Sequence, residues 1–266
     1  MLDAVIAIRE RLRSHSPLVH CLTNQVVKNF TANVLLALGA APAMVEDPGE
    51  AGEFASVASG LLVNLGTLSR EQIQAMDNAI SSARKINTPW VLDPVAVGGL
   101  SLRTDFARKI ISSSPAIIRG NASEIIALAG QDGGGRGVES GRSSEAALEA
   151  ARSLSRKTGA VVLVTGKTDY AISGAKEIAI ANGHPLLTRV TGVGCAMGAV
   201  CAATAAVADS PLEAAVASAV FFGVAGEIAA RHAPHPGTFA VKFLDALDAL
   251  NATLLVEYAR VSSAEQ

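Results

Sequence analysis

Residues 190–198, VTGVGCAMG, combine a glycine turn, a cysteine and the start of a helix. Gly192 and Gly194 allow positive φ and close backbone approach. The Ala-rich run after them indicates a helix with unpaired N–H groups at the positive end of its dipole. Such a turn can bind a phosphoryl group in transit and stabilise the charge that develops on it. Alone, however, the segment is more typical of an ordinary glycine turn before a packed helix. It is neither a Walker A loop, because no Lys-Ser or Lys-Thr follows the glycines, nor a Rossmann fingerprint.

Two acidic residues follow apolar runs that have the character of strands. Asp93 precedes a Pro- and Gly-rich turn, where a carboxylate is either a turn former or a ligand for a metal ion or a substrate hydroxyl. Glu124 lies in the run RGNASE at 119–124, in which Asn121 has the position of a helix N-cap and Glu124 that of its capping-box partner. If Glu124 also faces the cleft at the carboxyl ends of the strands, it is a candidate for holding Mg²⁺ through water.

Polar residues end two further apolar runs. Thr165 and Gly166 close the run at 161–165, where a hydroxyl and backbone N–H groups can face the phosphates of ATP, although this pattern is weak by itself. Near the N-terminus a strand pattern stops at Thr23 and Asn24, and an amphipathic helical pattern begins. Asn24 is therefore a further candidate for binding a polar ligand.

These side chains need strands that end at one edge of a sheet. Short, continuously apolar runs alternate with longer helical patterns, which indicates βα units around a mostly parallel sheet covered on both faces. We predict strands at 17–22, 41–45, 61–65, 90–93, 116–119 and 160–165, a strand pair at 170–173 and 177–180, helices at 26–38, 69–86 and 144–158, and a run of helices from Cys195 onward. Residues 131–142 read as an exposed loop, because the βα periodicity resumes after them. We therefore predict one α/β domain over residues 1–266.

Composition restricts the partners and the compartment. Half of the 266 residues are hydrophobic, and the formal net charge is −2 with no Lys/Arg cluster, which argues against a nucleic-acid partner. The three cysteines form no CxxC pair, so neither a zinc site nor a disulfide framework is expected, and the cytoplasm is the natural compartment. The N-terminus lacks the apolar core of a signal peptide. The uncharged run at 214–226 favours a buried helix over a membrane span, so no membrane partner is expected.

Several of these segments occur together in the order and spacing of one family. From about residue 17 to the C-terminal helices, the chain resembles the hydroxyethylthiazole kinases in the runs HCLTNQVVKNFTANVLLALGAAPAM, LLVNLGTL, VLDPVAVGG, IIRGNASEI, VVLVTGKTDY and VTGVGC. The combination is specific, whereas no single run is. The resemblance implies a ribokinase-like three-layer α/β/α fold and transfer of the γ-phosphoryl group of ATP to the alcohol of 4-methyl-5-(2-hydroxyethyl)thiazole in thiamin salvage. It also implies Mg²⁺ and a homotrimer with sites near the subunit boundaries.

The motifs and the resemblance together predict the site residues. For catalysis they indicate Cys195, Gly192 and Gly194; for substrate binding Met44, Gly192, Asn24 and Asp93; for ATP binding Arg119, Thr165 and Asn121; and for the metal Glu124 and Asp93.

Cys195 stands where most ribokinase-like kinases carry an aspartate that acts as a base, and the thiazole kinases resemble this chain in having cysteine there. A helix N-terminus is expected to lower the pKa of a thiol. Phosphoryl transfer also depends more on positioning and charge stabilisation than on a strong base. We therefore expect Cys195 to assist removal of the hydroxyl proton; the alternative is a small buried residue at a helix start.

The chain departs from the family pattern at a few points. Ala96 and Gly99 stand where the resemblance leads us to expect Gly and Ala, and Val193 stands where Thr is common. Competing functions within the fold are a kinase for a pyridoxal- or hydroxymethylpyrimidine-type alcohol and an ADP-dependent dehydratase that repairs hydrated nicotinamide cofactors. Both are expected to carry Asp in place of Cys195. A third possibility is a catalytically silent binding protein, against which the joint presence of Asp93, Glu124 and the two turn glycines argues.

Overall fold

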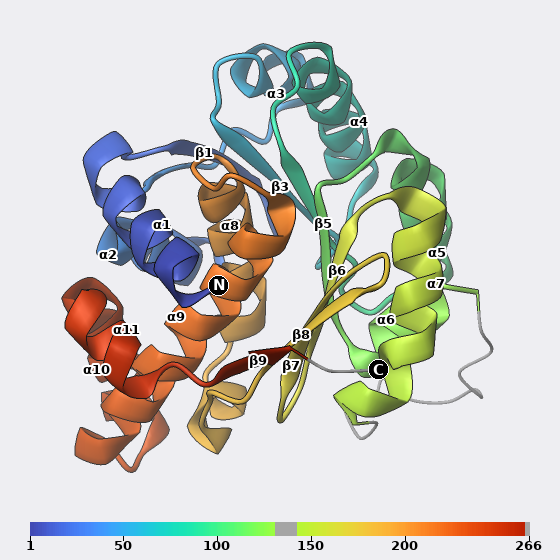
Figure 1. The fold of residues 1–266 in the computed structure, drawn as a ribbon. Coiled ribbons are helices and arrows are strands. Elements are labelled where there is room, and N and C mark those ends of the chain that lie inside the picture. The colour runs from blue at the N-terminus through green and yellow to red at the C-terminus, as the bar shows by residue number, and fades with distance from the viewer. Residues whose placement is uncertain (131–142, 264–266) are drawn as a thin grey trace.

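A nine-stranded sheet runs through the part of the chain that the computed structural model describes, residues 1–130 and 143–263 (Figure 1). The strand order is β2-β1-β3-β4-β5-β6-β7-β8-β9; β1 to β6 pair in parallel, and the pairs from β6 to β9 are antiparallel. The strands are β1 (Leu18–Leu22), β2 (Ala41–Ala43), β3 (Gly60–Asn64), β4 (Trp90–Asp93), β5 (Ile117–Asn121), β6 (Val161–Thr165), β7 (Asp169–Ser173), β8 (Lys176–Ile180) and β9 (Val261–Ser263).

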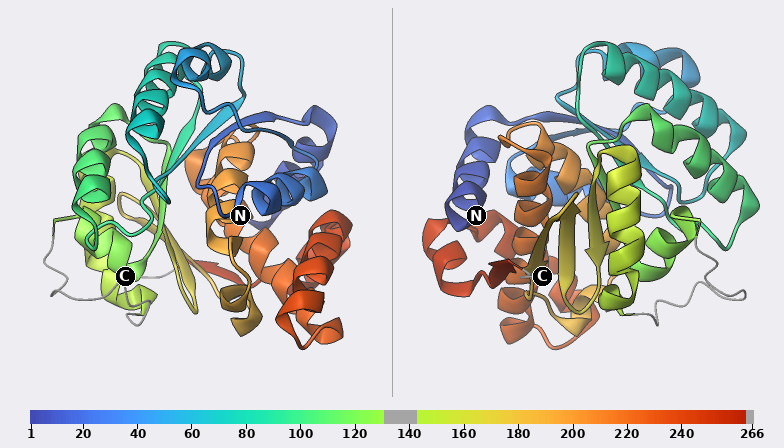
Figure 2. Two further views of the ribbon diagram at one scale, coloured as in Figure 1. Left: turned by 180° about the vertical axis from the view of Figure 1, so that it is seen from behind. Right: turned by 45° about the vertical axis from the view of Figure 1, so that its right-hand side comes forward.

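Helices cover both faces of the sheet, which gives three layers (Figure 2). One core packs α1, α2, α8, α9, α10 and α11 against the sheet, and a second core packs α3 to α7 against the opposite face. The helices are α1 (Leu2–His15), α2 (Lys28–Leu38), α3 (Pro48–Ala55), α4 (Arg70–Lys85), α5 (Ser101–Ile110), α6 (Ala122–Leu128), α7 (Leu148–Thr158), α8 (Val193–Ala205), α9 (Pro211–His232), α10 (Pro236–Ala249) and α11 (Ala252–Tyr258). The predicted three-layer α/β/α fold with a mostly parallel sheet is therefore confirmed.

Alternation along the strands explains how a continuously apolar run serves two cores. In β4, Val91 lies in the core with α8, whereas Trp90 and Leu92 lie in the core with α4 and α5. Successive side chains of a strand point to opposite faces, so a parallel strand covered on both sides needs apolar residues throughout. Asp93, which ends β4, is thereby placed at the carboxyl edge of the sheet.

The central helix α9 is longer than the uncharged run at 214–226 suggested. It spans 22 residues and is apolar enough to cross a membrane by length and composition, but 78% of its most apolar stretch is buried inside the fold. Its Ala and Gly residues allow close packing against α8 and α10, which agrees with the predicted buried helix. Length was thus a poor reason for the prediction, and burial is the better one.

Other predicted boundaries shift by a few residues. The predicted helix 26–38 begins at Lys28, and α8 begins at Val193, two residues before Cys195. The segment 144–158 opens with a 3₁₀ turn at Ser144–Ala147 before α7 begins. The predicted loop 131–142 lies outside the described residues, and the single domain over 1–266 stays a prediction.

Arg9 ties the two ends of the chain together inside the helical layer. Its guanidinium donates to the backbone carbonyls of Leu38 at 3.1 Å, Leu247 at 3.4 Å and Asp248 at 3.1 Å, which lie at the C-terminal ends of α2 and α10. Burial, followed by the nearby charge of Arg13, lowers the pKa of Arg9 to about 10. Arg9 therefore supplies donors to helix-end carbonyls that have no partner within their own helices.

Candidate active site

Polar side chains gather where β3 to β6 end. In the parallel register, Asn64 of β3 pairs with Asp93 of β4, and Asn121 of β5 pairs with Thr165 of β6. Asn24 follows β1 at the same edge and donates through Nδ2 to Asn64 Oδ1 at 3.1 Å. The carboxyl edge of a parallel sheet is where α/β proteins bind ligands. The structure therefore brings together side chains that lie far apart in the sequence.

The glycines of α8 bring its first turn directly against this edge. Gly192 is the N-cap, with φ of 94°, and a Cβ there would lie 2.9 Å from Val27 Cγ1. A Cβ on Gly194 would lie 3.1 Å from Nη1 of Arg119, and one on Gly198 would lie 3.1 Å from Oδ2 of Asp93. Larger residues would thus displace α8 from the Arg119 and Asp93 side chains. The N–H groups of the first turn, which have no partner within the helix, lie beside Arg119 and Asp93. Such N–H groups suit a bound anion.

Asp93 is fully buried, and Arg119, whose side chain is 12% exposed, lies beside it as a group of opposite charge. Nη1 of Arg119 lies 3.8 Å from Oδ1 of Asp93, and Nη2 donates to Thr165 Oγ1 at 2.9 Å. Burial raises the pKa of Asp93 to about 7; Arg119 and a hydrogen bond from Asn64 oppose this rise, and Glu124 adds to it. Burial opposes the charge of Arg119 too, but Asp93 and Glu124 raise its pKa above the ordinary value. The site therefore holds a permanent cation beside a carboxyl group whose pKa is close to neutral pH.

Glu124 performs the capping role that its sequence position predicts. Its Oε2 accepts from the backbone N–H of Asn121 at 2.9 Å, and Asn121 Oδ1 accepts from the N–H of Glu124 at 3.0 Å. Its Oε1 accepts from the N–H of Ala96 at 3.1 Å, which ties the turn after β4 to the start of α6. Each carboxylate oxygen retains a second lone pair for a hydrated metal ion. The predicted metal role of Glu124 stays a prediction.

Ala96 adopts a left-handed backbone conformation in this turn, with φ of 62°. A non-glycine residue there costs about 1–2 kcal/mol relative to the right-handed region. This is the position where the resemblance led us to expect glycine. At this departure from the family pattern, the chain retains the backbone conformation that a glycine would favour. Ala96 is therefore a strained residue beside Glu124.

Asn64 is a site residue that the sequence analysis missed. It is fully buried, its Nδ2 donates to Asp93 Oδ2 at 2.7 Å, and its Oδ1 accepts from Asn24 and, at 3.0 Å, from the N–H of Gly66. Asn24 Nδ2 also lies 3.3 Å from the sulfur of Cys195. An available signal was that Asn64 is a polar residue ending a strand that is otherwise entirely apolar, like Asp93 on the neighbouring strand.

The expected lowering of the Cys195 pKa by the helix N-terminus is wrong. Burial raises the pKa of the Cys195 thiol to about 11, and the charge of Asp93 adds to this; the nearby amides of Asn64 and Asn24 and the charge of Arg119 oppose it. Desolvation of the thiolate therefore outweighs the helix terminus and the nearby donors. The thiol is protonated at neutral pH and lies beside Asn24 and the glycine turn, and its predicted part in catalysis stays a prediction.

Three predicted residues, Thr165, Met44 and Asn121, remain. Thr165 accepts from Arg119 and donates to the carbonyl of Gly120 at 3.3 Å, so its hydroxyl belongs to the same network. Met44 follows β2 and is half-buried against the core that contains α8. No contact in the structure tests the binding of ATP by Asn121, or of substrate by Met44 and Asn24, and these roles stay predictions.

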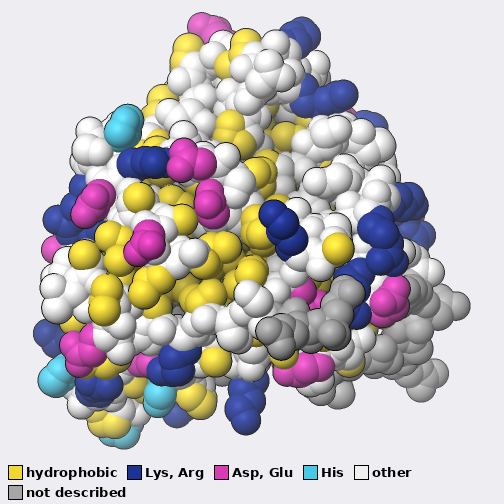
Figure 3. Space-filling model, viewed as in Figure 1, with side chains coloured by type: hydrophobic (Ala, Val, Ile, Leu, Met, Phe, Trp, Pro, Cys, Tyr) yellow, Lys and Arg dark blue, Asp and Glu magenta, His cyan; other side chains and the backbone are white. Residues whose placement is uncertain are grey.

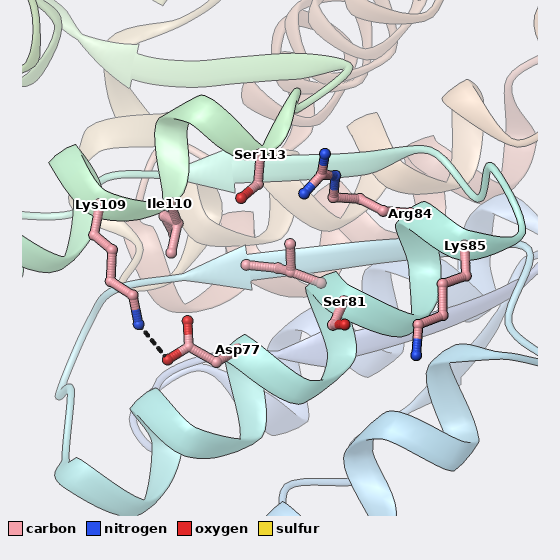
Figure 4. A pocket seen from close by; sticks show the side chains of 8 residues that line it. Asp77, Ser81, Arg84, Lys85, Lys109, Ile110 and Ser113 are labelled. Carbon is pink, nitrogen blue, oxygen red and sulfur yellow. Dashed lines mark hydrogen bonds and ion pairs between the residues drawn. The ribbon is translucent and has the colours of Figure 1, made fainter.

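A surface hollow lies at the amino end of the parallel strands and is separate from the candidate active site. It measures about 460 Å³ and is lined by the last turns of α4 and α5, with Lys109 paired to Asp77 at 2.6 Å (Figure 4). Arg84 and Lys85 lie at its rim, just before the chain enters β4 at its amino end (Figure 4). None of the predicted site residues lines it.

Comparison with known proteins identifies the family. The family model "Hydroxyethylthiazole kinase family" matches residues 9–253. A protein named hydroxyethylthiazole kinase from Akkermansia muciniphila is 54% identical over 264 residues, which are 99% of this chain and 97% of that protein. The solved structure of hydroxyethylthiazole kinase from Pyrococcus horikoshii superposes with a TM-score of 0.92 at 38% identity, covering 99% of this chain and 100% of that one. A ribokinase-like superfamily protein from Enterococcus faecalis shares the fold, with a TM-score of 0.64 at 11% identity over 93% of this chain and 94% of that one. The glycine turn, the Asp93–Arg119 pair and Cys195 thus lie in a chain that belongs to the hydroxyethylthiazole kinase family.

Proposed function

We propose that the protein phosphorylates the hydroxyl group of 4-methyl-5-(2-hydroxyethyl)thiazole with ATP, in thiamin salvage. The observation that carries the proposal is the contact of the first turn of α8 with Arg119, which is possible because residue 194 is glycine. This arrangement places the backbone N–H groups of the first turn beside a largely buried guanidinium, and both can stabilise a transferring phosphoryl group. Membership of the thiazole kinase family supplies the substrate.

In this proposal each residue has a distinct task. Arg119 and the N–H groups after Gly192 stabilise the negative charge of the phosphoryl group as it passes from ATP to the alcohol. Thr165 orients the guanidinium, because its Oγ1 accepts a hydrogen bond from Nη2 of Arg119 at 2.9 Å. Because the Cys195 thiol is protonated at neutral pH, it contributes as a hydrogen-bonding neighbour of the alcohol and not as a standing thiolate. As the alcohol oxygen bonds to the γ-phosphorus and the bond to the ADP oxygen breaks, a loose transition state tolerates late loss of the hydroxyl proton, which a phosphate oxygen or solvent water accepts.

The residues at the sheet edge are compatible with Mg²⁺ delivered with ATP. Oδ1 of Asp93 is buried without a hydrogen-bond partner among the described residues, so it can accept from a metal-bound water. Within the same residues, no group of three or more His, Cys, Asp or Glu side chains forms a complete metal cage. This suits an ion that keeps several waters and takes ligands from substrate phosphates. Bound there, Mg²⁺ would neutralise charge on the phosphates, with Asp93 and Glu124 as its protein partners.

The first experiment is ADP release from the purified protein with MgATP and the thiazole alcohol, beside pyridoxal and a hydroxymethylpyrimidine. Thiazole-dependent release that is abolished by chelating Mg²⁺ is the expected result. Release with another alcohol and none with the thiazole would refute the proposed substrate while keeping the site. The same protein without any alcohol measures background ATP hydrolysis.

We also propose that the enzyme is a cytoplasmic homotrimer. The free state of all three cysteines is compatible with a reducing compartment. Exposed apolar side chains such as Val26 and Leu36, at 68% and 58% exposure, provide surface for contact between subunits. Apolar side chains also gather over the region of α1 and α9 (Figure 3). Light scattering coupled to gel filtration should give three times the mass of one chain, and the mass of one chain would refute the trimer.

A further inference from the structure

The buried side-chain amide of Asn64 lies between two groups that have roles in the proposed function, Asp93 and Cys195. Asn64 contacts Asp93 on one side and, through Asn24, Cys195 on the other. Among the described residues, its Nδ2 is the only hydrogen-bond donor to the Asp93 carboxylate, at 2.7 Å, since Arg119 remains 3.8 Å away. Asn64 therefore supplies the hydrogen bond that orients the Asp93 carboxylate between Arg119 and α8.

The surroundings fix the orientation of the Asn64 amide. Its Oδ1 accepts two N–H groups, from Gly66 and from Asn24, and its Nδ2 faces a carboxylate oxygen. A flipped amide would place its oxygen against the carboxylate and its N–H₂ group against two donors, so only one orientation satisfies every partner. Gly66 helps to hold the cluster together, because a Cβ there would lie 2.7 Å from the side chain of Asn24.

We infer that Asn64 is a positioning residue for phosphoryl transfer, which holds the Asp93 carboxylate and, through Asn24, the Cys195 thiol in the geometry for reaction. The inference rests on the proposed function and names a residue in it that acts without touching the substrate. A purely structural role would require only that the buried polar groups be satisfied. A positioning role requires in addition that the loss of Asn64 act through Asp93.

The main test replaces the donor without changing the shape. Asn64→Asp puts an oxygen where Nδ2 faces Asp93, so two carboxyl groups meet. With the thiazole and MgATP as substrates, kcat should fall about 10- to 100-fold, as is usual when the partner of a metal-binding or catalytic group is removed. The KM for ATP should stay within about threefold, because the hydrogen bonds of Asn64 reach neither Arg119 nor Thr165. Asn64→Leu is the uncharged second variant if the paired carboxyl groups prevent folding.

Asn182 provides a matched control elsewhere in the fold. It is 4% exposed, donates to the carbonyl of Tyr258 at 2.8 Å, accepts from the N–H of Arg260 at 2.7 Å, and faces a carboxylate of Glu227 at 3.2 Å. Asn182→Asp therefore also places a carboxyl group beside an acidic side chain. It should lower the melting temperature to a similar degree and leave kcat within about twofold. Equal loss of kcat in both variants, or full kcat in Asn64→Asp, would overturn the inference.

A double-mutant cycle separates action through Asp93 from a general loss of packing. In the Asp93→Asn background, Asn64→Leu should change kcat by less than about threefold, and the unfolding equilibrium constants should show the same lack of additivity. Additive effects would overturn the inference. The unfolding cycle needs no substrate, so it reports on the Asn64–Asp93 link even if the thiazole is not turned over. Inactivity of the wild type with the thiazole refutes the proposed function alone, whereas absence of coupling refutes the role of Asn64.

Discussion

Gly194→Ala should make the helix more stable and the enzyme slower. Residue 194 is the second residue of α8 and has no positive φ, so alanine is favoured there by up to about 1 kcal/mol relative to glycine. The added Cβ would lie 3.1 Å from Nη1 and 3.2 Å from Nη2 of Arg119, whereas ordinary contacts begin at 3.4 Å. The guanidinium must therefore move by a few tenths of an ångström.

The size of the kinetic effect follows from that displacement. A misplacement of about 1 Å at a reacting centre costs roughly 100-fold in rate, so a few tenths of an ångström should cost about 3- to 10-fold in kcat/KM for ATP. Steady-state kinetics measures this loss, and urea unfolding measures the change in stability. Gly237→Ala is the control, because Gly237 is also the second residue of its helix and a Cβ there meets nothing within 4 Å. It should gain similar stability and keep its activity. If the two variants behave alike in both assays, the contact between α8 and Arg119 does not matter for the reaction.

Three further substitutions test the strain, the electrostatics and the cysteine. Ala96→Gly removes a left-handed alanine and should raise the free energy of unfolding by about 0.5–1 kcal/mol, as a higher urea midpoint; an unchanged midpoint would contradict the strain. Burial raises the pKa of Asp169 to about 7, so between pH 4 and pH 7 the folded state binds more protons than the unfolded state and the free energy of unfolding falls as the pH rises. Asp169→Asn should reduce that slope by up to about 1.4 kcal/mol per pH unit, and an identical slope in urea titrations would argue against a buried protonated carboxyl. Cys195→Ala should retain measurable but reduced turnover, because a protonated thiol only assists; full turnover would remove Cys195 from the mechanism.

The sheet could be predicted from the sequence because its strands carry their own signal. The runs at 61–63 and 90–92 are continuously apolar and short, as expected of strands buried on both faces, and the structure places strands there. The short strand β9, at 261–263, has no such pattern, since it exists only because the chain returns to pair with β8. Long-range pairing of this kind is not encoded in local periodicity.

Most residues of the candidate site were named from the sequence, whereas the pKa shift at Cys195 was not predicted correctly. Asp93 was found from its strand-end position and Arg119 from the resemblance to the family, and the structure brings them together as an ion pair. Asn64 was missed because its run, LLVNLG, contains no charged residue and its side-chain partners Asp93 and Asn24 come from two other segments. The pKa of Cys195 was predicted in the wrong direction because burial depends on what packs over the residue, which the motif does not show.

The bonds of Arg9 connect the beginning of the chain to residues that the ribosome adds near its end. During synthesis α1 emerges before α10, but two of the three carbonyls that accept from Arg9 belong to residues 247 and 248. Until those residues leave the exit tunnel, the guanidinium cannot be buried with all its acceptors, and an incompletely paired buried charge is costly. The first helix must therefore wait for the last part of the polypeptide before it docks fully. A chain truncated just before residue 247 would therefore have an incompletely packed N-terminal helix, which chaperones and proteases can bind.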